Sequence, residues 1–144
     1  MGERRAQSPT GWTYQVGDVN SEEKGSGARA NQGKTEFHLV PLSLLEGTAQ
    51  VFMYGRDKYA AWNWAKGMDW SIPYDCAQRH LSAWFFKKEE LDVESSLHHI
   101  DHAICNLIML KHFLEYYKEG DDRPDRFMDR GATGTAEEDV RDSV

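Results

Sequence analysis

The sequence is short of cysteine and contains no long apolar run. Its 144 residues include only two cysteines, Cys76 and Cys105, fewer than the disulfide framework of a small secreted domain requires. No segment approaches the roughly 20 consecutive apolar residues that a membrane-spanning helix needs. The first residues, MGERRAQSPTGW, also lack the apolar stretch of a signal peptide. We therefore expect reduced thiols, a cytoplasmic location and no membrane partner.

An excess of basic charge is missing as well. Lys and Arg number 17 against 24 Asp and Glu, which gives a net charge of -7 at pH 7. Proteins that bind nucleic acids carry a basic face, so we expect no nucleic-acid partner. The acidic balance is compatible with a nucleotide enzyme, because carboxylates can hold divalent cations that in turn recruit phosphates.

The two ends of the chain show no apolar periodicity. Residues 1–33 are dominated by Gly, Ser, Asn, Gln and charged residues, which predicts a flexible N-terminal arm. Residues 119–144 alternate Gly, Asp, Glu and Arg, which predicts an acidic, flexible C-terminal tail. The folded part is therefore expected at residues 34–118, as one helical domain.

Apolar periodicity predicts three helices in this part. The first begins at Pro41 and runs to about residue 59, and the second is capped by Ser71 and runs to about residue 87. The third begins near Ser95 or Ser96 and runs to about residue 119. No segment shows the alternation of a strand bounded by turns. The predicted fold class is all-α, a compact helical bundle with disordered or loosely docked tails.

The segment between the first two helices is rich in tryptophan, with Trp62, Trp64 and Trp70 close together. Tryptophan supplies a large flat apolar face and one hydrogen-bond donor. Two interpretations fit this segment. The indoles cap an open end of the helical core, or one of them stacks on a base.

A polar stretch, EELDVESSLHHIDHAICN, leads into the third helix. At 100° per residue, His99, His102 and Asn106 fall within about 60° of one another on that helix. Polar side chains on a half-buried face need partners, and a metal, a carboxylate or a phosphate can provide one. An acidic loop that leads into an HxxH turn offers oxygen and nitrogen ligands to a hard or borderline cation.

Known metal and phosphate motifs are absent from the sequence. It has no HExxH, no Walker A motif and no GxGxxG, and its two isolated cysteines cannot form a zinc finger. On the second helix, Asp75 and Arg79 fit an intrahelical ion pair, and His80 alone fits a core histidine. Beside the acidic loop and the HxxH turn, the same residues fit a functional site.

Three segments, taken in order, resemble a known family. They are KTEFHLVPLSLLEGTAQVFMYGRDKYAAWNWAKG, YDCAQRHLSAW and EELDVESSLHHIDHAICN. They are similar to the phage and bacterial dATP/dGTP diphosphohydrolases, a family related to the MazG-like all-α nucleoside triphosphate pyrophosphatases. The resemblance covers roughly residues 33–115 and implies a bundle of the MazG-like type.

The sequence departs from these families at two places. MazG-like enzymes usually hold magnesium with an ExxE pair and a later ExxD pair, and the second helix here has no ExxE. His99 and His102, with Asp101 between them, stand where the second pair is expected. Ser96 stands where the dATP/dGTP family tends to have glycine.

The resemblance implies metal-dependent cleavage of a (deoxy)nucleoside triphosphate between its α and β phosphates. The expected substrate is dGTP or dATP, the products are the monophosphate and pyrophosphate, and the cofactor is Mg²⁺ or Mn²⁺. The helical domain at 34–118 would be catalytic. A homodimer or homotetramer is expected, both from MazG-like relatives and because so small a helical unit leaves apolar surface uncovered. The location would be the cytoplasm of a bacterium, or of the infected host cell if the gene is a phage gene.

The resemblance and the polar stretch together assign candidate site residues. The expected metal ligands are Glu89, Asp92, Glu94, His99 and His102. The expected catalytic groups are His80, His99 and His102. The expected substrate contacts are Lys58 and Arg79 for the phosphates, Asn63 and Asn106 for the base or sugar, and Tyr54, Tyr59 or Trp64 for stacking on the base.

Two other functions stay open at this point. One is an HD-like metal-dependent nucleotidase that releases inorganic phosphate. The other is a non-catalytic helical interaction module, whose polar stripe would be a partner interface and would bind no metal.

Overall fold

The computed structural model describes residues 16–125, so the predictions for 1–15 and 126–144 lie outside the described residues. The chain divides into two compact units, Met1–Pro41 and Leu42–Val144, which are described separately. In the first unit, an isolated antiparallel bridge joins Val16 to Arg29. A short 3-10 helix, Phe37–Leu39, follows later in this unit.

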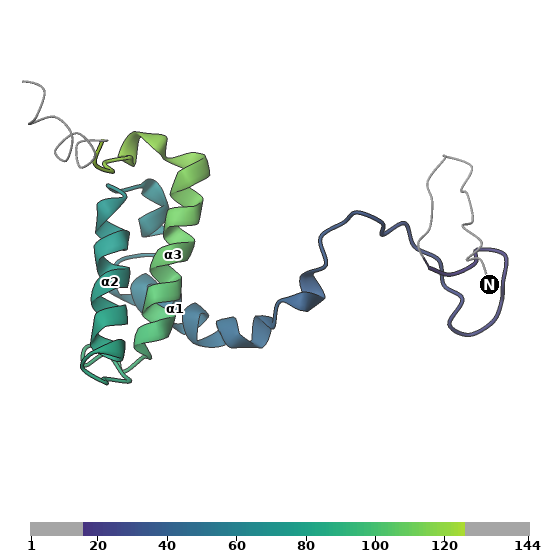
Figure 1. Ribbon diagram of the computed structural model, residues 1–144, viewed down its shortest axis with the longest axis horizontal. Helices are drawn as coiled ribbons and strands as arrows, with labels where there is room; N and C mark the ends of the chain where they lie inside the picture. The colour runs from purple at the N-terminus through teal and green to yellow at the C-terminus, as the bar shows by residue number, and fades with distance from the viewer. Residues whose placement is uncertain (1–15, 126–144) are drawn as a thin grey trace, which may run out of the picture. The chain divides into compact units, whose positions relative to one another are not determined.

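The second unit holds three α-helices: α1 is Glu46–Lys58, α2 is Ser71–Phe85 and α3 is His99–Tyr116 (Figure 1). Short 3-10 helices flank them at Leu42–Leu45 and Asn63–Lys66. Apart from isolated bridges, residues 16–125 contain no strand, so the predicted all-α class is confirmed. None of the helices within these residues is both long and apolar enough to cross a membrane.

The start of α2 differs from the prediction. Trp70, not Ser71, is the N-cap residue, and Ser71 is already helical. The backbone N–H of Ser71, which has no partner within the helix, donates to Asp122 Oδ1 at 2.8 Å. The Ser71 hydroxyl donates to the other oxygen of the same carboxylate. The helix is therefore capped by a carboxylate far along the chain, which local sequence cannot indicate. This contact comes from the segment predicted to be a tail.

The start of α3 also differs from the prediction, because Ser95 and Ser96 belong to the preceding loop. Ser96 has a φ of 58°, which is outside the right-handed helical region. The N-cap is His98, whose Nδ1 accepts a hydrogen bond from Ile100 N at 3.0 Å. A histidine here does what Ser or Asp usually does at a helix start.

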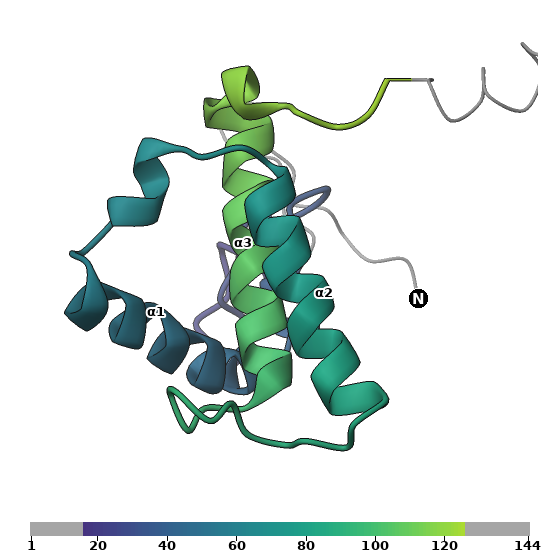
Figure 2. The same cartoon turned by 90° about the vertical axis from the view of Figure 1, so that its left-hand side faces the viewer.

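The helices pack around α3. Both α1 and α2 contact α3, and they contact it far more than they contact each other (Figure 2). The buried apolar side chains come from all three helices and include Val51 on α1, Ala77 on α2 and Phe113 on α3. The buried residues of α2 and α3 include the small side chains of Ala77, Ala83 and Ala103, and these two helices share the most extensive contact of the fold.

Two of the clustered tryptophans belong to the packing at one end of this core. Trp70 is 6% exposed, and its indole N–H donates to the Tyr117 carbonyl oxygen at 2.9 Å. Trp64 contacts Phe52, His112 and Phe113, with ring centroids 5.6, 5.1 and 6.2 Å away. The capping interpretation therefore describes Trp64 and Trp70.

Two glycines in α1 should respond oppositely to alanine. A Cβ added at Gly47 would collide with the Asp101 carboxylate, whereas a Cβ added at Gly55 would meet open space. The same Asp101 carboxylate accepts a hydrogen bond from the Thr48 hydroxyl at 3.4 Å. We expect Gly55→Ala to raise the free energy of unfolding by about 1 kcal/mol, the usual gain in helix propensity. Gly47→Ala should lower the melting temperature despite the same gain. Thermal unfolding followed by circular dichroism measures both, and equal stabilisation would show that Asp101 does not pack on α1.

Candidate functional site

A cavity of about 1080 Å³ is walled by α1 and the segment after it, by α2, by the loop before α3 and by α3 itself. Small-molecule sites usually occupy about 300–1000 Å³, so a nucleotide fits inside. Most of the residues predicted from the sequence line it. They are Tyr54, Lys58, Tyr59, Asn63, Trp64, His80, Asp92, Glu94, His102 and Asn106.

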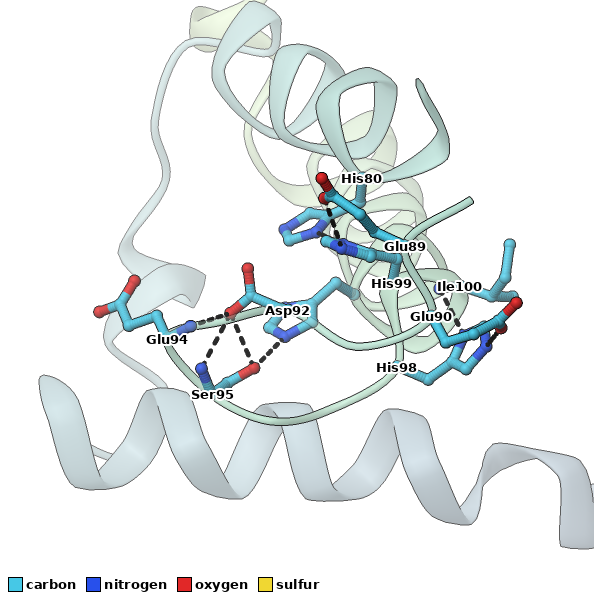
Figure 3. A network of polar contacts seen from close by, with 10 residues as sticks. His80, Glu89, Glu90, Asp92, Glu94, Ser95, His98, His99 and Ile100 are labelled. Carbon is cyan, nitrogen blue, oxygen red and sulfur yellow. Dashed lines mark hydrogen bonds and ion pairs between the residues drawn. The ribbon is translucent and has the colours of Figure 1, made fainter. Parts of the chain in front are cut away.

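Three histidines meet beside the cavity: His80 and His102 line it, whereas His99 is buried next to them and is not part of the lining. His80 from α2 and His99 from the first turn of α3 bring their Nδ1 atoms to 2.8 Å (Figure 3). His80 also stacks on His102, with ring centroids 4.3 Å apart and planes 10° apart. The spacing of three residues places His99 and His102 on the same face of α3, where α2 packs.

Asp92 completes this group from the loop. Single ligand atoms of His80, Asp92 and His99 all lie within 4.8 Å of one another. The Asp92 carboxylate is held by the Ser95 N–H at 2.9 Å and the Ser95 hydroxyl at 3.0 Å (Figure 3). Ser95 Oγ also lies 2.6 Å from His102 Nε2, so one serine ties the loop to α3. We call His80, Asp92 and His99 the donor cluster.

The charges of this group suit a metal ligand set. Burial, followed by the proximity of His102 and His99, lowers the pKa of His80 to about 4. Burial also lowers the pKa of His102. Burial raises the pKa of Asp92, but hydrogen bonds from Ser95 outweigh it and hold the pKa below its usual value. At neutral pH the site therefore presents the Asp92 carboxylate beside the uncharged imidazoles of His80 and His102.

One nitrogen of the donor cluster lacks a partner. His99 Nε2 is buried and makes no hydrogen bond, and its side chain is 6% exposed. Glu89 Oε2 lies 3.7 Å from His99 Nε2, beyond hydrogen-bond distance. Buried polar atoms are nearly always satisfied, so this nitrogen is an atom that could ligate a cation.

Other predicted ligands and phosphate contacts lie elsewhere. Glu94 is outside the donor cluster and accepts a hydrogen bond from Lys58 Nζ, which joins α1 to the loop. Glu89 is largely exposed and does not line the cavity. Arg79 is also outside the lining, and its guanidinium donates to Cys76 Sγ at 3.0 Å.

Two residues at the site were not predicted from the sequence. Ser95 is predicted only as a possible helix cap, whereas its N–H and hydroxyl bind Asp92, whose side chain closes a turn by also accepting from Glu94 N at 3.2 Å. Trp62 lines the cavity rim and is 73% exposed. No pattern in the sequence separates it from Trp64 and Trp70.

Comparison with known proteins shows the family. Residues 24–123 match the family described as dATP/dGTP diphosphohydrolase, N-terminal, and the chain belongs to this family. A protein of Salmonella phage PMBT28 named dATP/dGTP diphosphohydrolase is 31% identical over 98 residues. That match covers 68% of this chain and 33% of the phage protein, so the chain corresponds to about a third of that relative. No solved structure matches the chain.

Proposed function

We propose that this chain hydrolyses dATP or dGTP to the monophosphate and pyrophosphate with the help of a divalent metal. The observation that carries the proposal is the donor cluster of His80, Asp92 and His99, two members of which, His80 and Asp92, line a cavity large enough for a nucleotide. The substrate class is supported by the family and by the name of the phage relative.

The donor cluster fits a metal, and its chemistry favours Mn²⁺ over Mg²⁺. Two imidazole nitrogens and one carboxylate suit borderline ions, whereas Mg²⁺ prefers an all-oxygen set. The unpartnered Nε2 of His99 and the uncharged ring of His80 both support this assignment. A bound ion would neutralise phosphate charge and lower the pKa of a bound water. This differs from the sequence-based prediction, which put Mg²⁺ first and included Glu89, Glu94 and His102.

The remaining residues bind and orient. His102 acts as a positioning residue, because it stacks on His80 and contacts Ser95, which in turn holds Asp92. Lys58 supplies a cation at the cavity wall, where it is paired with Glu94 until a phosphate takes the place of that carboxylate. Asn106 also faces the cavity; its amide donates to the His102 carbonyl at 2.8 Å and keeps its oxygen for a sugar or base.

The donor cluster also favours a second candidate, the HD-like nucleotidase, because histidines and an aspartate replace the carboxylate pairs of MazG-like enzymes. The test is to incubate the common ribo- and deoxyribonucleoside triphosphates with Mn²⁺ or Mg²⁺ and to separate the products by chromatography. We expect dAMP or dGMP with pyrophosphate. Release of inorganic phosphate would favour the HD-like nucleotidase. If no nucleotide is turned over, the non-catalytic interaction module becomes the favoured function.

We also propose a homodimer or homotetramer. Large apolar side chains stay exposed on the second unit, among them Phe85 at 67% and Phe86 at 78%. Such surface usually marks an interface. Light scattering at micromolar concentration measures the mass, and a monomer would refute this assembly.

A further inference from the structure

Trp62 is the indole that is both exposed and part of the cavity wall. Of the tryptophans in residues 16–125, Trp70 is buried and Trp64 is packed among other rings. Trp84 lies on α2 and does not line the cavity. Trp62 is 73% exposed and rests on Trp64, with ring centroids 6.1 Å apart and planes inclined by 41°. Much of the Trp62 ring is therefore open to a ligand.

The backbone of Trp62 is strained. Its φ of 62° and ψ of 14° place it in the left-handed region, which is unfavourable for a bulky side chain. It precedes the 3-10 helix Asn63–Lys66, and Ala65 N donates to its carbonyl oxygen at 3.0 Å. A glycine would make the same turn without strain. Strained residues of this kind concentrate where they clamp ligands, so the presence of tryptophan indicates that the ring itself is needed.

We propose that Trp62 is the platform on which the purine base of the substrate stacks. The inference rests on the proposed function, which places the phosphates at the donor cluster and Lys58. A purine is a wide flat π-system, and stacking on an indole is insensitive to which base is present. This accounts for one site that accepts both adenine and guanine. Asn63, the next residue, also lines the cavity, and its amide can both donate to and accept from a base edge.

Tyr59 is the rival platform. It is 68% exposed and also lines the cavity. Its ring is already approached by the Lys58 ammonium, 5.7 Å from the ring centroid. A face held by a cation is less free for a base than the face of Trp62, so we assign the base to Trp62 and include Tyr59 in the test.

The experiment compares Trp62→Ala, Trp62→Phe and Trp62→Gly with Trp84→Ala as the matched control in the full chain. For Trp62→Ala we expect the KM for dGTP and dATP to rise about 5- to 150-fold, the usual worth of one base–aromatic stack. Inhibition by inorganic tripolyphosphate, which has no base, should not change. Trp62→Phe should keep most of the affinity, and Trp84→Ala should behave like wild type. Trp62→Gly should bind dGTP as weakly as Trp62→Ala does. It should melt at a higher temperature than Trp62→Ala, because glycine adopts the positive φ of residue 62 without strain.

An unchanged KM for dGTP in Trp62→Ala would overturn the proposal. Equal losses for dGTP and tripolyphosphate would also overturn it, because they would show a role in folding alone. A base-dependent loss in Tyr59→Ala with none in Trp62→Ala would assign the platform to Tyr59 instead.

A second measurement separates this inference from the proposed function. The product dGMP should quench tryptophan fluorescence in the wild type and in Trp84→Ala, but not in Trp62→Phe, and this readout needs no turnover. Quenching without hydrolysis would support the platform while refuting the enzyme. Hydrolysis without quenching would do the reverse.

Discussion

Removal of divalent metal should abolish nucleotide hydrolysis, and Mn²⁺ should restore it at lower concentration than Mg²⁺. The donor cluster presents two imidazole nitrogens and one ionised carboxylate within 4.8 Å, a set that binds a borderline cation more tightly than Mg²⁺. The measurement is the initial rate on dGTP after dialysis against a chelator, with each metal then added over a concentration series. Full activity after exhaustive chelation would rule out the metal mechanism.

Metal binding itself provides an independent check. Isothermal titration calorimetry of the chelated protein with Mn²⁺ should give about one ion per chain, since the cluster supplies the three protein ligands of a single site. The absence of any heat of Mn²⁺ binding would contradict the assignment of the donor cluster as a metal site, whatever the activity of the protein. A protein that binds Mg²⁺ but not Mn²⁺ would instead favour an all-oxygen ligand set, drawn from the carboxylates among the predicted ligands, Glu89, Asp92 and Glu94.

Two adjacent histidines should give opposite results when each is changed to alanine. His99 is buried in the donor cluster, so His99→Ala should lose Mn²⁺ binding and reduce kcat by at least the order of 10²-fold; outer-shell changes at metal sites alone can cost that much. His98 instead caps α3 through its Nδ1 and contacts Glu90 Oε2 at 2.8 Å through its Nε2. His98→Ala should therefore cost about 1 kcal/mol of stability, as a lost N-cap does, and leave kcat near normal.

The paired measurement is the melting temperature, kcat and Mn²⁺ affinity of both variants. A His99→Ala protein with reduced stability but normal kcat would show that His99 is a core histidine only. An inactive His98→Ala protein beside an active His99→Ala protein would place the site on the side of α3 to which His98 projects, about 100° from His99.

The helices and the polar face of α3 could be predicted because both depend on local periodicity. The stripe of His99 and His102 faces the packed side of α3, as the spacing indicated, and both side chains are buried. The caps could not be predicted in the same way. Ser71 reads as an N-cap until Asp122, distant in sequence, is seen to bind it. Ser95 reads as a cap until Asp92 and His102 are seen to occupy its hydroxyl.

The sequence also could not rank the acids of the loop. Glu89, Asp92 and Glu94 are close together in sequence and all carry carboxylates, so the sequence alone does not distinguish them as metal ligands. The turn closed by Ser95 aims Asp92 at the histidines. Glu94 on the same loop reaches Lys58 on α1 instead. The choice depends on the path of the loop between two helices, which no residue spacing specifies.

Because α1 and α2 each rest on α3 with little contact between them, the cavity is built from two separate packing interfaces. The donor cluster belongs to the α2–α3 side and its loop, whereas Trp62 and Asn63 follow α1. Under the proposed function, substitutions that reshape the α1 side would alter which nucleotide fits and would leave the nitrogens of the donor cluster in place. Base preference could then change during evolution without any change at the donor cluster.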